Sequence, residues 1–263
     1  MDECETMGVM SDHTPNRPIK ATKTTFEIVD VVADRGTVGV LELAEELDRS
    51  KSTIHSHLST LESLGYLIND EGRYRLSLKW FDHGIRARNE RTVFDVATKE
   101  IRALAETIDE PVWLYTEDHG RAVVVDAANL DGGDDYKVAR VGWRTYLHCT
   151  SSGKTILAHL PDETVDEIIA RHGLPAETDN TITSRAELER ELVTIREQGY
   201  ATNDEETADG IYALSVPIVL DERVFGAVCI SGPAYRLSKP DVQASLLDSL
   251  FETVNRIELT YKY

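Results

Sequence analysis

Apolar residues recur with helical spacing in three segments near the start of the 263-residue chain. Residues 25–32 and 41–47 each predict a helix, and Arg35-Gly36 ends the first of them. In the third segment, at about 100° per residue, one face collects four apolar side chains: Ile54, Leu58, Leu61 and Leu64. We expect this face to pack against the first two helices.

Two short apolar segments, residues 66–68 and 74–76, flank the turn signal Asp70-Glu71-Gly72. Two helices, a tight turn, a third helix and a hairpin follow one another in the order of a winged helix-turn-helix, which we place at residues 19–77. The pattern therefore predicts that the chain binds double-stranded operator DNA.

The third helix carries small or polar donors opposite its apolar face. They are Ser52, His55, Ser56 and Ser59, with Lys51 at the N-terminal edge. A helix that enters the major groove needs such a face, because base edges are recognised by hydrogen bonds. His57 falls at the apolar border, which favours a packed or capping histidine over one that contacts bases. The alternative for the whole segment is an ordinary amphipathic helix with a solvated, serine-rich face.

Cationic residues flank this helix and the hairpin. Ser50 is the expected N-cap, and Arg49 and Lys51 beside the helix N-terminus suit a phosphate group. Arg73 and Arg75 are two residues apart on one strand, so they point to the same face of the wing. We expect them at phosphates or in the minor groove; a solvated arginine pair is the alternative.

Helical and strand patterns alternate after the hairpin. Residues 78–92 predict a linker helix and residues 93–108 another helix, and residues 128–135 form a loop rich in Asp and Gly. Further helices are expected at 151–159, 162–172, 184–198 and 238–259, and strands at 112–115, 122–125, 200–202, 211–220 and 224–231. Because the hairpins require antiparallel pairing, the fold class is α+β rather than a doubly wound sheet.

The chain is strongly acidic, with a formal net charge of −19. Residues 19–77 hold seven basic and ten acidic residues, so most of the acid lies in the second part of the chain. Lysine is scarce and arginine supplies most of the positive charge. This surface fits a halophilic protein of haloarchaeal cytoplasm, and a merely acidic mesophilic protein is the alternative. In molar salt, binding to DNA must depend on base contacts, shape and dimer avidity.

Cysteines and terminal features exclude several classes of protein. Cys4, Cys149 and Cys229 are odd in number and show no CxxC spacing, so neither a disulfide framework nor structural zinc is expected. No apolar run approaches the roughly 18 residues of a membrane span. No leader pattern is present at the N-terminus. We expect a cytoplasmic protein without a cofactor or membrane partner, whose residues 1–18 form a disordered tail.

Three motifs that imitate enzyme sites are weak. Residues 151–155 resemble a phosphate-binding loop, but that motif needs glycine where His148 stands. His148 and Cys149 are adjacent, whereas a nucleophile and its base need mutual hydrogen-bond reach and a third group. The acidic residues at 204–206 and at Asp134-Asp135 are generic in so acidic a chain. We expect no catalytic and no metal-binding residues.

Three groups of motifs follow one another along the chain in an order and at a spacing that together match a family pattern. They are Lys51-Ser52-Thr53-Ile54-His55 leading to Leu61-Glu62-Ser63-Leu64-Gly65-Tyr66-Leu67; Gly142-Trp143-Arg144 with Thr150-Ser151-Ser152-Gly153-Lys154; and Gly199-Tyr200-Ala201-Thr202-Asn203-Asp204 with Gly210-Ile211, Val216-Pro217 and Cys229-Ile230-Ser231-Gly232-Pro233. From about residue 20 to residue 257 the chain resembles the IclR family of one-component transcription regulators.

The resemblance implies an N-terminal winged helix-turn-helix and, at residues 93–263, a C-terminal GAF-like effector domain with an antiparallel sheet. It implies a homodimer or a dimer of dimers, and a small-molecule effector, often an organic or aromatic acid, that controls a catabolic operon. Two positions depart from the family pattern. Ser56 stands where arginine is frequent, so a DNA contact is missing or is replaced by Lys51 and Arg49. Asn203 stands where an acidic residue is common, which alters the polarity of the pocket.

The helix start at residues 150–153 can hold an anion through its backbone N–H groups, to which the hydroxyl groups add donors. The family resemblance implies effector contacts at Thr150, Ser151, Ser152, Gly153, Asn203, Cys229 and Ser231. We expect a small carboxylate or sugar acid as effector. The alternative is that Ser151 or Ser152 only caps the helix and that Cys229 is a small core residue.

Three functions are compatible with the whole pattern. The first and best supported is a ligand-controlled transcription regulator. The second is an enzyme or ligand-binding protein with an incidental helix-turn-helix, which would need its activity in residues 92–263 alone. The third is a DNA-binding architectural protein without an effector.

Overall fold

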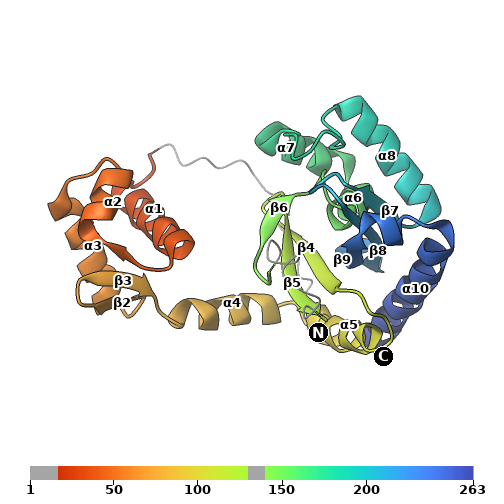
Figure 1. The fold of residues 1–263 in the computed structure, drawn as a ribbon, viewed down its shortest axis with the longest axis horizontal. Helices are drawn as coiled ribbons and strands as arrows, with labels where there is room; N and C mark the ends of the chain where they lie inside the picture. The colour runs from red at the N-terminus through yellow and green to blue at the C-terminus, as the bar shows by residue number, and fades with distance from the viewer. Residues whose placement is uncertain (1–16, 130–139, 263) are drawn as a thin grey trace. The chain divides into compact units, whose positions relative to one another are not determined.

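The computed structural model describes residues 17–129 and 140–262. It divides into two compact units, Met1–Glu90 and Arg91–Tyr263, which are described separately (Figure 1). Residues 1–16 of the tail expected at 1–18, most of the loop at 128–135 and the pair Asp134-Asp135 lie outside the described residues. No helix in the described ranges is long and apolar enough to cross a membrane.

The first unit is a small helical domain with a short antiparallel sheet. Its helices are α1 (Lys20–Arg35), α2 (Val40–Glu46) and α3 (Lys51–Ser63), followed by α4 (Lys79–Asn89). Its described strands pair in the order β1 (Val38–Gly39), β3 (Arg73–Leu76) and β2 (Leu67–Asp70). The expected three helices and hairpin are present. Strand β1 was not predicted, because two residues are too few to show a period.

The core of the first unit forms where the helical pattern predicted it. Ile54 and Leu58 of α3 are fully buried, together with Ile28 of α1 and Leu43 of α2. The expected burial of Leu64 is wrong, because α3 ends at Ser63 and leaves Leu64 as an exposed C-cap. Helix α1 begins at Lys20, before the expected residue 25. Its first turns are polar and include the buried Thr24, so they show no apolar period.

Helix α4 has no buried residue, but its first turn is hydrogen-bonded to the segment between α3 and β2. The indole Nε1 of Trp80 donates to the Tyr66 carbonyl at 3.0 Å, and Nζ of Lys79 donates to the Leu64 carbonyl at 3.0 Å. The side chains of Phe81 and Ile85 are exposed. The start of the expected linker helix is therefore fixed to the rest of the first unit.

The described residues of the second unit form one antiparallel sheet of six strands in the order β6-β5-β4-β9-β8-β7. Its strands are β4 (Val112–Asp118), β5 (Arg121–Ala128), β6 (Arg144–Tyr146), β7 (Ala201–Asp204), β8 (Ile211–Leu220) and β9 (Arg223–Pro233). Its helices are α5 (Val93–Ala105), α6 (Ser151–His159), α7 (Asp162–His172), α8 (Arg185–Gln198), α9 (Ala234–Leu237) and α10 (Pro240–Lys262).

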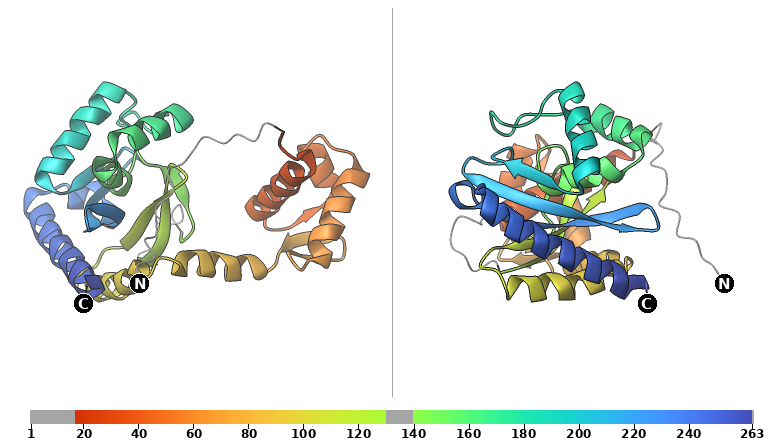
Figure 2. Two further views of the ribbon diagram at one scale, coloured as in Figure 1. Left: turned by 180° about the vertical axis from the view of Figure 1, so that it is seen from behind. Right: turned by 90° about the vertical axis from the view of Figure 1, so that its right-hand side faces the viewer.

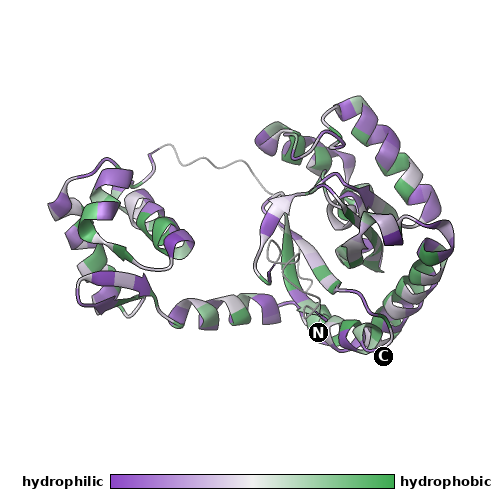
Figure 3. Ribbon diagram, viewed as in Figure 1, coloured by the Kyte–Doolittle hydropathy of each residue, from purple (hydrophilic) through white to green (hydrophobic). Residues whose placement is uncertain are grey.

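Helices cover both faces of this sheet, and each face has its own core. Along β4, Val112 and Leu114 join the core under α5 and α10, whereas Trp113 and Tyr115 join the core under α6, α7 and α8. This alternation is the two-residue period of a strand buried on both sides. Figure 2 shows α5 and α10 along the same side of the sheet, and bands of apolar and polar residues alternate along both helices in Figure 3.

The α+β class and the antiparallel sheet are confirmed. The predicted bounds of α6, α7 and β8 agree with the structure. The three-residue strand β6 and the four-residue helix α9 were missed, since neither is long enough to show a period.

Candidate functional sites

The polar face of α3 is exposed, as a DNA-reading helix requires. Lys51, Ser52, His55 and Ser56 are exposed and Ser59 is half-buried. Ser50 is the N-cap: its hydroxyl accepts a hydrogen bond from the Thr53 N–H at 3.1 Å. The hydroxyl of Ser56 donates to the Ser52 carbonyl at 2.9 Å, so its lone pairs remain available to a partner. His57 is half-buried and its Nδ1 lies 2.8 Å from Oγ1 of Thr25, as expected of a packed histidine.

The two wing arginines have different surroundings. The guanidinium of Arg73 donates to the Thr37 carbonyl at 2.9 Å and pairs with Glu42 at 3.4 Å. The pKa of Glu42 is lowered, first by the hydrogen bond from the Gly39 N–H and then by Arg73. Arg75 is exposed, and the structure gives it no ion pair among the described residues. Arg75 is therefore the cation of the wing that is free to meet a phosphate.

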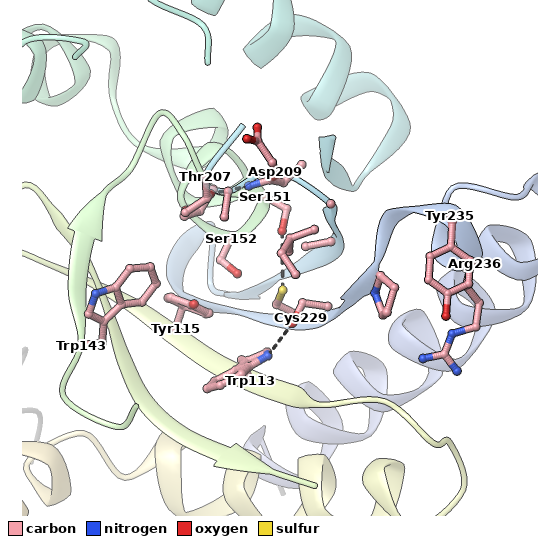
Figure 4. A pocket seen from close by; sticks show the side chains of 18 residues that line it. Trp113, Tyr115, Trp143, Ser151, Ser152, Thr207, Asp209, Cys229, Tyr235 and Arg236 are labelled. Carbon is pink, nitrogen blue, oxygen red and sulfur yellow. Dashed lines mark hydrogen bonds between the residues drawn. The ribbon is translucent and has the colours of Figure 1, made fainter. Parts of the chain in front are cut away.

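A cavity of about 560 Å³ opens in the second unit between α6, the sheet and the segment after β7 (Figure 4). Its aromatic wall is made by Trp113 and Tyr115 of β4 and by Trp143, which precedes β6. Tyr235 and Arg236 of α9 line its far end. Arg236 is already paired, since its guanidinium lies 2.8 Å from the buried carboxylate of Glu110.

The opposite wall is the start of α6, formed by Thr150, Ser151 and Ser152. Thr150 is the N-cap and accepts from the Gly153 N–H at 3.0 Å, and the Ser151 hydroxyl lies 3.6 Å from the Cys229 sulfur. The Ser152 hydroxyl is buried and points toward the cavity, and within the described part of the chain it has no oxygen or nitrogen partner and only the weakly accepting Cys229 sulfur nearby. The N–H groups of Ser151 and Ser152 have no partner four residues earlier, because they begin the helix.

Gly153 does not belong to the cavity lining. A Cβ atom at this position would lie 2.1 Å from the Leu147 carbonyl oxygen, so glycine permits α6 to approach the preceding loop.

The other expected contact residues line the cavity, but their polar groups are engaged within the protein. The side-chain amide of Asn203 donates to the Cys149 carbonyl at 2.8 Å and to Thr207 at 2.6 Å, and its oxygen accepts from the Glu206 N–H at 3.0 Å. The Ser231 hydroxyl accepts from the Trp113 indole N–H at 2.8 Å. These bonds fix the shape of the cavity rather than leave the amide of Asn203 free.

Sequence reasoning missed the aromatic wall, together with Thr207, Asp209, Tyr235 and Arg236. A signal for one of these existed. Trp113 and Cys229 are directly opposed across β4 and β9, so the strand register joins the tryptophan to a residue that was expected in the pocket.

The thiol of Cys229, which lines the cavity, is expected to react slowly. Burial raises the pKa of Cys229 from an ordinary value of 9.0 to about 11, and burial likewise raises that of Cys149 to about 11. Two pKa units lower the thiolate fraction at pH 8 by about 100-fold. A nucleophilic Cys149 would need the opposite shift, and the ring of His148 instead faces the Pro175 carbonyl at 2.9 Å.

We therefore expect iodoacetamide at pH 8 to label neither buried cysteine of a Cys4→Ser variant until denaturant is added. Raising the pH toward 11 should speed the reaction, since the thiolate is the nucleophile. Mass spectrometry of the quenched protein measures both rates. Labelling of Cys229 at pH 8 at the rate of a free thiol would contradict the raised pKa.

Two family models match the chain. One for the IclR helix-turn-helix domain matches residues 24–71, and one for the bacterial transcriptional regulator IclR C-terminal domain matches residues 86–259. The chain is 31% identical to a probable HTH-type transcriptional regulator, ArcR, of Halobacterium salinarum over 92% of this chain and 94% of that protein.

Solved structures give the same match. The crystal structure of the Thermotoga maritima IclR has a TM-score of 0.76 and 30% identity, and covers 93% of this chain and 99% of that one. An IclR homolog from Microbacterium hydrocarbonoxydans, complexed with 4-hydroxybenzoate, shares the fold with a TM-score of 0.76 and 22% identity over 91% of this chain and 96% of that one.

Proposed function

Because the chain belongs to the IclR family of transcriptional regulators, we propose that a small organic or sugar acid in its cavity controls its binding to an operator. The family models and relatives are regulators of transcription and not enzymes. One observation carries the effector part of this proposal: at the start of α6, Ser152 presents toward the cavity a buried hydroxyl that has no oxygen or nitrogen partner among the described residues.

The carboxylate of the effector accepts hydrogen bonds from the N–H groups of Ser151 and Ser152 and from the Ser152 hydroxyl. The positive end of the α6 dipole favours the negative charge. The body of the effector packs against Trp113 and Trp143. The aromatic acid named for the Microbacterium homolog can stack on such a wall, whereas a sugar acid would lay its apolar C–H face on tryptophan.

The operator contacts divide into two kinds. Arg49, Lys51 and Arg75 neutralise phosphates. The exposed donors Ser52, His55 and Ser56 of α3, with the half-buried Ser59, hydrogen-bond to base edges. Each two-fold dimer, alone or within a dimer of dimers, presents two such helices, so the operator is palindromic or nearly so. The regulated genes form a catabolic operon for the effector acid.

The test selects genomic DNA fragments with the purified protein at high salt and then footprints the recovered site. A thermal-shift screen of pyruvate, gluconate, 4-hydroxybenzoate and related acids accompanies it. We expect a palindromic footprint, and one class of acid that both raises the unfolding temperature and changes operator affinity. Full affinity of a monomer for a single asymmetric half-site would contradict the dimer, and an acid-independent footprint would favour an architectural protein.

A further inference from the structure

A buried lysine lies behind the cavity. Lys154 of α6 is 2% exposed, and its Nζ lies 2.5 Å from Oε1 of Glu206 and 3.0 Å from Oε1 of Glu191. Glu206 is 8% exposed and Glu191 is 31% exposed. This is the lysine of the phosphate-loop-like motif, and its ammonium group is occupied by two carboxylates of its own chain.

Such a cluster is a costly way to stabilise a fold. Removing two charges from water costs several kcal/mol for each ion, and well-packed apolar residues often serve as well. The second oxygen of Glu206, Oε2, is buried and has no hydrogen-bond partner among the described residues. Burial accordingly raises the pKa of Glu206, an effect that Lys154 opposes. Stability alone therefore does not explain the pair.

The position of the pair offers an explanation. Lys154 lies on α6 three residues after Ser151, and Glu206 immediately precedes the five residues at 207–211 that line the cavity. The backbone of Glu206 is also held: its N–H donates to Asn203, and its carbonyl accepts from the Thr181 hydroxyl at 2.6 Å. The ion pair thus joins the α6 wall of the cavity to the wall that follows β7.

We propose that Lys154 is a positioning residue of the effector cavity, which holds the wall at residues 207–211 in register with the start of α6 through its ion pair with Glu206. This inference rests on the proposed function only in calling the cavity an effector site. Lys154 does not line the cavity and touches no ligand; it acts through Glu206. Glu191, which is more exposed and lies on α8 outside the cavity lining, contributes less.

Hydrogen–deuterium exchange of the full-length protein tests the proposal without any ligand. Lys154→Met leaves the Glu206 carboxylate buried without its cation, so we expect amides at 203–211 to exchange at least about tenfold faster than in the wild type. Glu191→Gln is the matched control, and its exchange at 203–211 should stay at the wild-type rate.

A charge-free pair separates positioning from stability. In Lys154→Met/Glu206→Leu both buried charges are gone, so we expect the unfolding temperature to recover while exchange at 203–211 stays fast. Recovery of both quantities would overturn the proposal, as would wild-type exchange in Lys154→Met. If Lys154→Met does not fold, the double variant decides alone. Since the exchange measurement uses no effector and no operator, its failure leaves the proposed function untouched.

Discussion

Replacement of Ser152 by leucine is expected to abolish the effector response while operator affinity keeps its wild-type value. Ser152 is 1% exposed and its hydroxyl faces the cavity at the start of α6, so the larger side chain fills the space that the carboxylate needs. Hydrogen bonds to charged groups contribute about 1.5–3 kcal/mol each, so losing two of them weakens acid binding by at least about 100-fold.

Ser152→Ala is the matched control. It removes the hydroxyl but leaves the cavity open and the backbone N–H groups in place, so acid binding should weaken by only about tenfold. Calorimetry with the acid found by thermal shift measures both variants, and circular dichroism confirms that each one folds. If Ser152→Leu binds the acid normally, the effector site lies elsewhere in the protein.

The second large effect is expected on α3. Lys51→Ala and His55→Ala should each weaken binding to the selected operator by on the order of 1–3 kcal/mol, because a lost base or phosphate contact is not replaced. Ser63→Ala is the control, since Ser63 is exposed on the last turn of α3, away from the N-terminal end that we propose contacts bases. Footprinting at one fixed salt concentration gives the affinities.

The wing should behave differently from α3. Arg75→Ala should reduce affinity for specific and non-specific DNA alike, as loss of a phosphate contact does. Arg73→Ala should instead lower the stability of the first unit, because Arg73 is hydrogen-bonded to Thr37 and paired with Glu42.

For α3, unchanged operator affinity in both Lys51→Ala and His55→Ala would contradict its placement in the major groove.

The sequence predicted those parts of the fold that depend on local periodicity. The apolar face of α3, the strand β8 and the bounds of α6 and α7 all follow from the spacing of side chains within one segment. The prediction that Leu64 is buried was wrong, because its exposure is decided by where α3 ends and not by the spacing of apolar residues.

The cavity could be predicted only in part, since its walls come from segments far apart in the chain. The start of α6 carries a local signal, but the bond between Trp113 and Ser231 joins residues 118 positions apart. The same holds for Lys154, whose partners Glu191 and Glu206 belong to other elements. Sequence alone places Lys154 only in a segment that resembles a phosphate-binding loop, and the tertiary structure shows its two carboxylate partners.

Binding of a ligand in the cavity and binding of an operator on α3 are expected to be coupled. Calorimetric titration of the selected acid, with and without saturating operator, tests this most directly. Because coupling free energy is reciprocal, the factor by which operator changes the acid's affinity must equal the factor by which the acid changes operator affinity. Equal factors that differ from one, and that disappear in Ser152→Leu, are the predicted result. An acid affinity that operator leaves unchanged would contradict the account.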